Sequence, residues 1–193
     1  VKSVNIVSIK LLRELGIENS HDYLNKFGFP KSRLPRDLSL ALGSGNFSPA
    51  EMVRAYSVIA SNGFIPDIYF IDSIKDRDGN NIFSQSEYYS SLNYQNISAF
   101  PWLDTIEMNA KRPYYVLNPL NNNKRVIDER ISFLMADTLK GFMKNGVAGR
   151  KSEFLARDDI GGKTGTTNDS VSTWFSGFHK DLATTVWVGT DDF

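Results

Sequence analysis

Residues 161–169 read GGKTGTTND, and this stretch is the strongest indication of the fold in the 193-residue chain. Two glycines precede Lys163, and Thr164 and Thr166 flank a third glycine, Gly165. Side chains alternate across a strand, so Lys163 and Gly165 are expected on one face and the two threonines on the other. Small residues let another backbone lie alongside a strand, and a lysine beside hydroxyls suits a carboxylate. A backbone N–H of the same strand can also act as an oxyanion-hole donor.

The strands around this stretch indicate an α+β fold. Strand patterns occupy IGGKTGTT, STWFSGF and LATTVWVGT, and HKD joins the last two in a predicted hairpin. An earlier hairpin is predicted around DGNN at 78–81. Because the helical patterns come first and the final strands follow as a group, the order argues against a repeated βαβ unit. No internal repeat or linker divides the chain, so residues 1–193 are expected to form part of one domain.

Two short helices are predicted at the N-terminal end. The stretch SVNIVSIKLLRELG at 3–16 has apolar residues at helical spacing, and Gly16 suits the left-handed residue that ends a helix. The stretch SHDYLNKFGF at 20–29 is expected to begin with Ser20 as its N-cap and to end at Gly28.

Two further helices are predicted later in the chain. In SPAEMVRAYSVIASNG, Ser48 is the expected N-cap, Pro49 takes the first turn and Glu51 completes a capping box. The stretch DERISFLMADTLKGFMKNG at 128–146 is expected to bury one apolar face. That face consists of Ile131, Leu134, Met135, Thr138, Leu139 and Phe142.

The composition argues against several classes of function. Lysine plus arginine and aspartate plus glutamate both number 22, so no net field favours nucleic acid as a partner. The chain has no cysteine, which excludes disulfides, thiolate metal sites and a cysteine nucleophile. It has two histidines, His21 and His179, too few for a multi-histidine zinc site. We therefore expect no metal and no cofactor. No apolar run reaches membrane-spanning length, and no signal-peptide pattern is present.

Three motifs that point to other chemistry fail on spacing or context. A phosphate-binding loop needs a glycine where this chain has Arg157, which argues against a nucleotide site at Lys163. In DRDGNN the glycine, Gly79, is fourth and not sixth, so a hairpin turn is favoured over a calcium loop. Neither His21 nor His179 has a Ser–Asp framework around it, and both are expected at the surface.

Several separated motifs, in order, resemble the penicillin-binding, active-site-serine family. These are SVNIVSIKLLRELGI, LSLALGSGNFSPAEMVRAYSVIASNGF, IGGKTGTTND, TWFSGF and TTVWVGTDD. Together they look like the C-terminal part of the transpeptidase domain of class A, bifunctional penicillin-binding proteins. The resemblance covers almost the whole chain and is weakest over 84–126. It implies a penicillin-binding, serine β-lactamase-like fold, with an antiparallel sheet packed with helices.

The resemblance also implies a reaction and a location. A serine would attack the penultimate D-alanine carbonyl of a peptidoglycan stem peptide and form an acyl-enzyme, which an amine of a neighbouring stem would then take up. β-Lactams would acylate the same serine. The protein would act on the periplasmic or extracytoplasmic face of the bacterial membrane, anchored through an N-terminal segment. Family members that transfer the acyl group to water, as D,D-carboxypeptidases or β-lactamases, remain alternatives, as does a non-catalytic β-lactam-binding module.

The resemblance assigns catalytic roles to three residues. Ser3 would relay a proton toward the leaving amine, and Asn5 would hold the acyl side-chain amide and the activating lysine. Lys163 would place a positive charge beside Ser3 and attract the substrate carboxylate. Alternatively, Ser3 is a plain helix N-cap and Asn5 a first-turn polar residue.

Three further residues are expected to bind substrate. Thr164 and Thr166 would contact the carboxylate, and the backbone N–H of Thr166 would form half of the oxyanion hole. Gly165 would let the substrate strand approach.

One family motif is missing from the sequence. The family's nucleophile and its activating lysine form a Ser-x-x-Lys motif that precedes Ser-x-Asn, yet no serine here is followed by a lysine at that spacing. Ser8 and Ser73 have a lysine two positions on, which is the wrong distance. The resemblance therefore predicts that the nucleophile lies before Val1, that an upstream part of the same domain completes the site, and that residues 1–193 alone are inactive.

Overall fold

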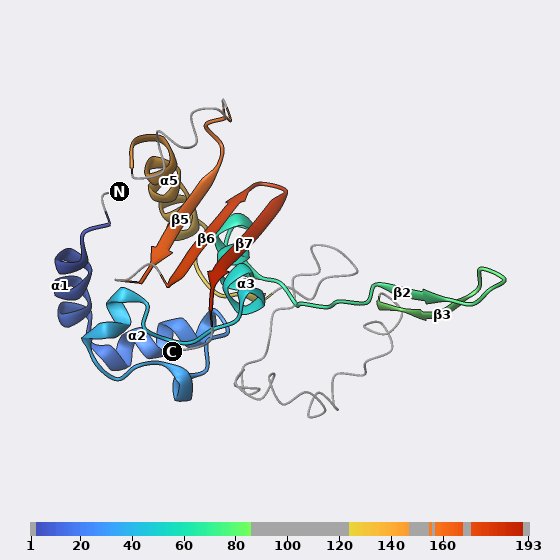
Figure 1. Ribbon diagram of the computed structural model, residues 1–193, viewed down its shortest axis with the longest axis horizontal. Coiled ribbons are helices and arrows are strands. Elements are labelled where there is room, and N and C mark those ends of the chain that lie inside the picture. Colours follow the sequence, from blue (N-terminus) through green and yellow to red (C-terminus); the bar gives the residue numbers. More distant parts are fainter. Residues whose placement is uncertain (1–2, 86–123, 147–154, 156, 168–170, 191–193) are drawn as a thin grey trace. The chain divides into compact units, whose positions relative to one another are not determined.

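The computed structural model describes residues 3–85, 124–146, 155, 157–167 and 171–190 of the chain (Figure 1). The chain divides into two compact units, of which the larger combines Val1–Ile65 with Arg125–Phe193 and the smaller is Pro66–Lys124.

The larger unit holds the helices that the sequence predicts. They are α1 (Asn5–Leu15), α2 (Ile17–Lys26), α3 (Pro49–Ala60) and α5 (Glu129–Asn145), with the short 3-10 helices η1 (Lys31–Arg33) and η2 (Leu38–Leu42). Gly16 ends α1 as predicted, with a φ of 84°, and its N–H donates to the carbonyl of Leu12. The prediction that Ser20 caps the second helix is wrong. Gly16 is the N-cap of α2 as well, so Ser20 lies inside the helix and its hydroxyl donates to the Gly16 carbonyl at 2.9 Å.

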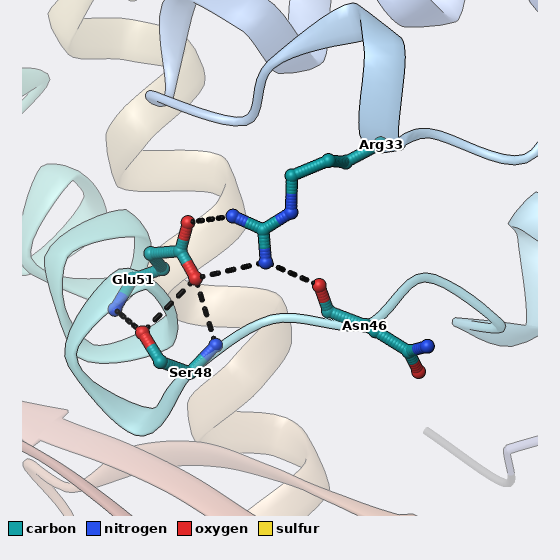
Figure 2. Close-up of polar contacts among 4 residues, drawn as sticks. All are labelled: Arg33, Asn46, Ser48 and Glu51. Atoms are coloured by element: carbon teal, nitrogen blue, oxygen red, sulfur yellow. Dashed lines mark hydrogen bonds and ion pairs between the residues drawn. The ribbon is translucent and has the colours of Figure 1, made fainter. Parts of the chain in front are cut away.

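The start of α3 is held by the predicted capping box. The hydroxyl of Ser48 accepts a hydrogen bond from the N–H of Glu51, and the Glu51 carboxylate accepts one from the N–H of Ser48. Figure 2 shows that Arg33 reaches the same carboxylate and also donates to the carbonyl of Asn46. Glu51 therefore serves both as a helix cap and as the partner of an arginine from η1.

A three-stranded antiparallel sheet closes the larger unit. It consists of β5 (Gly161–Thr166), β6 (Ser172–His179) and β7 (Leu182–Gly189), in that spatial order. The pairing of His179 with Leu182 confirms the predicted hairpin. Helix α5 packs along β5, and α3 packs against β6 and β7 (Figure 1). The strand that carries Lys163 is thus an outer strand of this sheet.

The packed face of α5 differs from the predicted one. Ile131, Leu134, Met135 and Thr138 are exposed, whereas Ser132, Phe142 and Met143 are buried; of the predicted face, Phe142 alone falls in this buried set. Ser132 donates through its hydroxyl to the carbonyl of Ile59 in α3 at 3.0 Å. A small polar residue at this contact lets the two helices approach closely, and the apolar periodicity alone could not identify it.

Helix α3 lies at the centre of the apolar core. Ala55 packs with Phe29 and Leu34 on one side, and Val58 packs with Ile65 and Ile127 on another. By contrast, α1 buries only Leu12. The segment after α2 is therefore held to the unit mainly by Phe29 and Leu34, which pack against Ala55 of α3.

The chain leaves and re-enters the larger unit at a short strand pair. Strand β1 (Phe64–Ile65) pairs with β4 (Lys124–Arg125). Just before β1, Gly63 has a φ of 98°, and its carbonyl accepts the N–H of Val126 at 2.8 Å.

The smaller unit contains the predicted hairpin. Strand β2 (Ser73–Lys75) pairs antiparallel with β3 (Asn81–Ser84). In the turn, the carboxylate of Asp76 accepts the backbone N–H groups of Asp78 and Asn80. The hairpin interpretation of DRDGNN is confirmed. No helix among the described residues is long and apolar enough to cross a membrane.

Candidate active site

The candidate site is built on the outer edge of β5. Lys163 pairs with Ser176, Gly165 with Trp174 and Thr166 with Thr173 on β6. Within the described part of the chain, β5 has no strand on its other side. Gly165 and Thr166 are exposed in the described structure, so the end of this edge, called the open edge below, has room for a peptide that adds as a further strand.

The hydrogen-bonding phase of β5 directs particular backbone groups to this open edge. Beyond the strand, the N–H of Thr167 donates to the carbonyl of Ser172 at 3.0 Å, so Thr167 faces β6. Backbone groups in an antiparallel pair alternate in direction from one residue to the next. The N–H and C=O groups of Thr164 and Thr166 consequently point away from β6, toward the open edge.

The glycines before the lysine make room for aromatic rings. A Cβ atom on Gly161 would lie 2.7 Å from the ring of Phe178, and one on Gly162 would lie 2.9 Å from the ring of Phe175. Gly165 differs, because its Cβ would lie 3.4 Å from the nearest atom, the Cβ of Trp174. The first two glycines are required by packing within the sheet, and Gly165 leaves space that the fold does not need.

The ammonium of Lys163 lies at the edge of the strand. Its Nζ donates to the carbonyl of Thr164 at 2.7 Å and lies 4.6 Å from the ring centroid of Phe142 on α5. The side chain is half-buried, and this burial lowers the pKa of Lys163 below its ordinary value. Four residues upstream in the sequence, Asp159 accepts two hydrogen bonds from Arg157, which lower the pKa of that carboxyl to about 2.

Sequence reasoning missed the aromatic surroundings of Lys163. Phe142 is 2% exposed and forms a cluster with Met143, against which Ile160 and Phe175 pack. The helical periodicity predicts that Phe142 is buried, but it contains no signal that places the ring against a lysine on a different element.

Ser3 and Asn5 lie at the start of α1 and are exposed. The N-cap of α1 is Val4, and no side chain caps this end of the helix, so Ser3 is not the helix N-cap. Ser3 has a φ of 53°, in the left-handed region that non-glycine residues seldom adopt. Among the described residues, no hydrogen bond joins Ser3 or Asn5 to Lys163. The structure therefore groups Lys163, Thr164, Gly165 and Thr166 on one strand, and the participation of Ser3 and Asn5 in the same site stays a prediction.

One of the two histidines is not at the surface. His21 is 1% exposed, and its Nε2 lies 2.9 Å from the carbonyl of Pro35, an acceptor to which the ring donates. Helix α2 begins at Ile17 and not at Ser20, so His21 faces the interior from within the helix. His179 is half-buried, and its Nδ1 accepts the N–H of Asp181 at 3.2 Å. In the described structure, neither ring forms a hydrogen bond with a residue of β5. Within the described ranges, no group of three or more His, Cys, Asp or Glu residues could hold a metal ion.

Comparison with known proteins decides the family. The family model described as "Penicillin binding protein transpeptidase domain" matches residues 1–190. The chain belongs to this transpeptidase family. This match confirms the family inferred from the separated motifs, and the relatives described next, which are named penicillin-binding protein 1A, confirm its class A character. The α+β fold class is confirmed as well.

Relatives of this transpeptidase chain are proteins named penicillin-binding protein 1A. The chain is 36% identical to penicillin-binding protein 1A of Pseudomonas aeruginosa over 98% of its length. It is 33% identical to penicillin-binding protein 1A of Vibrio cholerae over 99% of its length. The alignments cover 25% and 23% of those proteins, so the chain spans about a quarter of the length of these curated relatives.

Solved structures show the same fold. Penicillin-binding protein 1A from Haemophilus influenzae aligns with 99% of the chain and 29% of its own, at a TM-score of 0.76 and 30% identity. A D,D-transpeptidase domain of a peptidoglycan glycosyltransferase from Eggerthella lenta aligns over the whole chain and 47% of its own, at a TM-score of 0.66. At 19% identity, this second likeness concerns the fold alone.

Proposed function

We propose that the chain is part of a serine D,D-transpeptidase that cross-links peptidoglycan stem peptides through an acyl-enzyme and is inhibited by β-lactams. The observation that carries this proposal is the outer edge of β5. There the outward-facing N–H of Thr166, the side-chain-free Gly165 and the half-buried ammonium of Lys163 lie within four consecutive residues.

Substrate binding follows from this edge. The D-Ala-D-Ala end of a stem peptide lies along β5 as an added strand, and Gly165 leaves room for its backbone. The terminal carboxylate meets the Lys163 ammonium and the hydroxyls of Thr164 and Thr166, which provide charge-assisted hydrogen bonds. β-Lactams occupy the same edge, since they carry an equivalent carboxylate beside their reactive carbonyl.

The reaction requires a nucleophile that residues 1–193 do not supply, because no serine among them has the Ser-x-x-Lys spacing. In the proposal, another part of the protein provides that serine and its lysine. The serine oxygen attacks the penultimate D-alanine carbonyl, and the bond to the terminal D-alanine nitrogen breaks. The outgoing nitrogen takes the proton that Ser3 relays. An amine of a second stem then attacks the ester, which restores the serine and forms the cross-link.

The residues of this chain would lower the barrier electrostatically. The N–H of Thr166 donates to the oxygen that becomes negative in the tetrahedral intermediate, as half of an oxyanion hole. Lys163 favours the proton relay through Ser3, and Asn5 holds the acyl side-chain amide. This arrangement requires Ser3 and Lys163 to come within hydrogen-bonding reach, or one water, in the complete site.

The proposal includes a setting for the protein. Peptidoglycan is assembled outside the cytoplasm, so the domain would act at the periplasmic or extracytoplasmic face of a bacterial membrane. A segment outside residues 1–193 would anchor it. The site needs no cofactor or metal, since an activated serine and hydrogen-bond donors suffice for acyl transfer.

Acylation by a fluorescent penicillin tests the function in the full-length protein. We expect Lys163→Ala to slow labelling by about 10²- to 10³-fold, because a charge is lost from a site that binds a carboxylate. Thr166→Val is the milder comparison, since the backbone donor survives. Near-normal labelling of folded Lys163→Ala protein would sink the assignment.

The fate of the acyl group separates the related activities. Incubation with a stem-peptide donor and an amine acceptor should give the cross-linked product. Release of the acyl group to water alone would indicate a D,D-carboxypeptidase or, with a β-lactam, a β-lactamase. Binding without a covalent adduct would indicate a non-catalytic module.

A further inference from the structure

Phe142 approaches Lys163 from outside the strand that carries the lysine. The Nζ atom lies 4.6 Å from the centroid of the Phe142 ring. This is within the distance at which the negative face of an aromatic ring attracts a cation. The lysine belongs to β5 and the phenylalanine to α5, which packs along that strand. The contact therefore ties the position of the ammonium to a different element of the fold.

The ring is itself held in place. Phe142 is 2% exposed and shares a cluster with Met143, against which Phe175 packs. The ring of Phe175 in turn fills the space over Gly162 and Gly177, where a Cβ atom would lie 2.9 and 2.7 Å from it. The Phe142 ring is therefore buried against a cluster that includes Phe175, whose own ring has no free space over Gly162 and Gly177.

Apart from the Phe142 ring, few described interactions hold the Lys163 ammonium in position. Its one hydrogen bond in the described structure goes to the carbonyl of Thr164, and no carboxylate pairs with it. Burial lowers the pKa of Lys163, and no charged group contributes to that shift. The titratable side chains of the two elements that pack against β5 include Asp137, Lys140 and Lys144 on α5 and His179 on β6. Among the described residues, none of them forms a hydrogen bond or ion pair with Lys163. The aromatic face of Phe142 and the carbonyl of Thr164 are thus the two described interactions that favour the charged form of Lys163.

We propose that Phe142 is a positioning residue, whose ring holds the protonated Lys163 ammonium at the open edge of β5. This inference rests on the proposed function, because it concerns the charge that attracts the substrate carboxylate. An ammonium has three donors. One goes to Thr164, one is directed to the ring, and the third remains for a substrate carboxylate or for Ser3. The ring thereby limits the directions in which the ammonium can donate.

The test compares Phe142→Leu, Phe142→Tyr and Met143→Leu in the full-length protein, through the pH profile of acylation by a fluorescent penicillin. Removal of the ring removes one of the two interactions that favour the charged form of Lys163 and leaves the hydrogen bond to Thr164. The acylation rate is expected to fall at alkaline pH as Lys163 loses its proton. Phe142→Leu should therefore shift this alkaline fall down by about half to one pH unit and slow acylation about three- to tenfold. Phe142→Tyr keeps a ring, so its acylation rate should fall at the same alkaline pH as that of the unaltered protein. Met143→Leu disturbs the same cluster but keeps the Phe142 ring, so the alkaline fall of its acylation rate should not shift. Equal profiles for Phe142→Leu and Met143→Leu, once matched for stability, would overturn the proposal.

A spectroscopic measurement decides the contact without any activity. The ε-methylene resonance of Lys163, labelled with ¹³C and assigned with Lys163→Arg, should be shifted upfield by the ring current of Phe142. The shift should persist in Met143→Leu and vanish in Phe142→Leu. If the unaltered protein shows no upfield shift, the proposal fails even where Phe142→Leu does not fold. If the shift is present but the unaltered protein is never acylated, the proposed function fails and the contact stands.

Discussion

Arg33 and Glu51 are eighteen residues apart in the sequence and joined by two hydrogen bonds, at 2.6 and 3.3 Å. The same guanidinium donates to the carbonyl of Asn46 (Figure 2). It also lies 4.9 Å from the ring centroid of Phe47. The arginine thus fastens η1 to the start of α3 and to the loop before it.

We expect Arg33→Met to lower the free energy of unfolding by about 1 kcal/mol, the upper end of the range for partly exposed ion pairs. The methionine retains much of the aliphatic stem but none of the hydrogen bonds. Arg130→Met is the matched control, because the Arg130–Asp128 pair is longer, at 3.4 Å, and its arginine is 87% exposed. Urea unfolding of both variants tests this expectation, and equal losses would contradict it.

Glu51 should make stability depend on pH below the ordinary range of a glutamate. Burial alone would raise the pKa of Glu51, but hydrogen bonds from Ser48 and Arg33 outweigh it and lower the pKa from 4.5. A lowered folded pKa gives stability that is fully present above pH 4.5 and is lost as the pH falls through the folded value. Melting temperatures from about pH 6 to about pH 3 should therefore fall more steeply for the unaltered protein than for Glu51→Gln. Parallel curves for the two proteins would show that Glu51 does not make stability depend on pH in this range.

Gly63 should tolerate no side chain. Its φ of 98° is unfavourable for other residues, and a Cβ there would lie 2.3 Å from the carbonyl oxygen of Ile127. We expect Gly63→Ala to cost about 3 kcal/mol or more, since the clash adds to about 1–2 kcal/mol of backbone strain. Gly43→Ala has a similar φ of 81° and no atom within 4 Å, so it should show the strain alone. Denaturant midpoints measure both, and a Gly63→Ala protein as stable as Gly43→Ala would refute the clash.

Alanine substitutions at Gly162 and Gly165 should have different effects on stability and acylation. Gly162→Ala places a Cβ 2.9 Å from Phe175 and 3.0 Å from the carbonyl of Ser176, so we expect a loss of stability. Gly165→Ala meets nothing closer than 3.4 Å, so the melting temperature should change little. Under the proposed function, Gly165→Ala should nevertheless slow penicillin acylation at least about tenfold, because the methyl group occupies the approach of the added strand. Unimpaired acylation would mean that the ligand does not lie along this edge.

Local sequence signals predict most of the elements but not their contacts. The capping box at Ser48 and Glu51 was predictable because both partners lie within one turn of helix. The same holds for the turn between β6 and β7. The start of α2 was not, since a single residue, Gly16, both ends one helix and begins the next.

Contacts between distant segments were beyond the reach of periodicity. The α5 pattern favours an apolar face, yet the residue nearest α3 is Ser132, whose partner is a carbonyl 73 residues away. The strand alternation of KTGT was predictable, whereas the position of the Lys163 ammonium against Phe142 depends on how α5 packs. The candidate strand could thus be found from the sequence, and the surroundings of its lysine could not.

The rings over Gly161 and Gly162 also limit how this strand can evolve. Every other amino acid brings a Cβ atom, and at these positions that atom would overlap Phe178 or Phe175. A larger residue at 161 could be accepted only together with a smaller one at 178. At 162 it would need both a smaller residue at 175 and a shift of the Ser176 carbonyl, which lies 3.0 Å from such a Cβ. Related sequences should therefore vary at these positions in pairs, whereas single changes that alter the response to a β-lactam should arise elsewhere on the site.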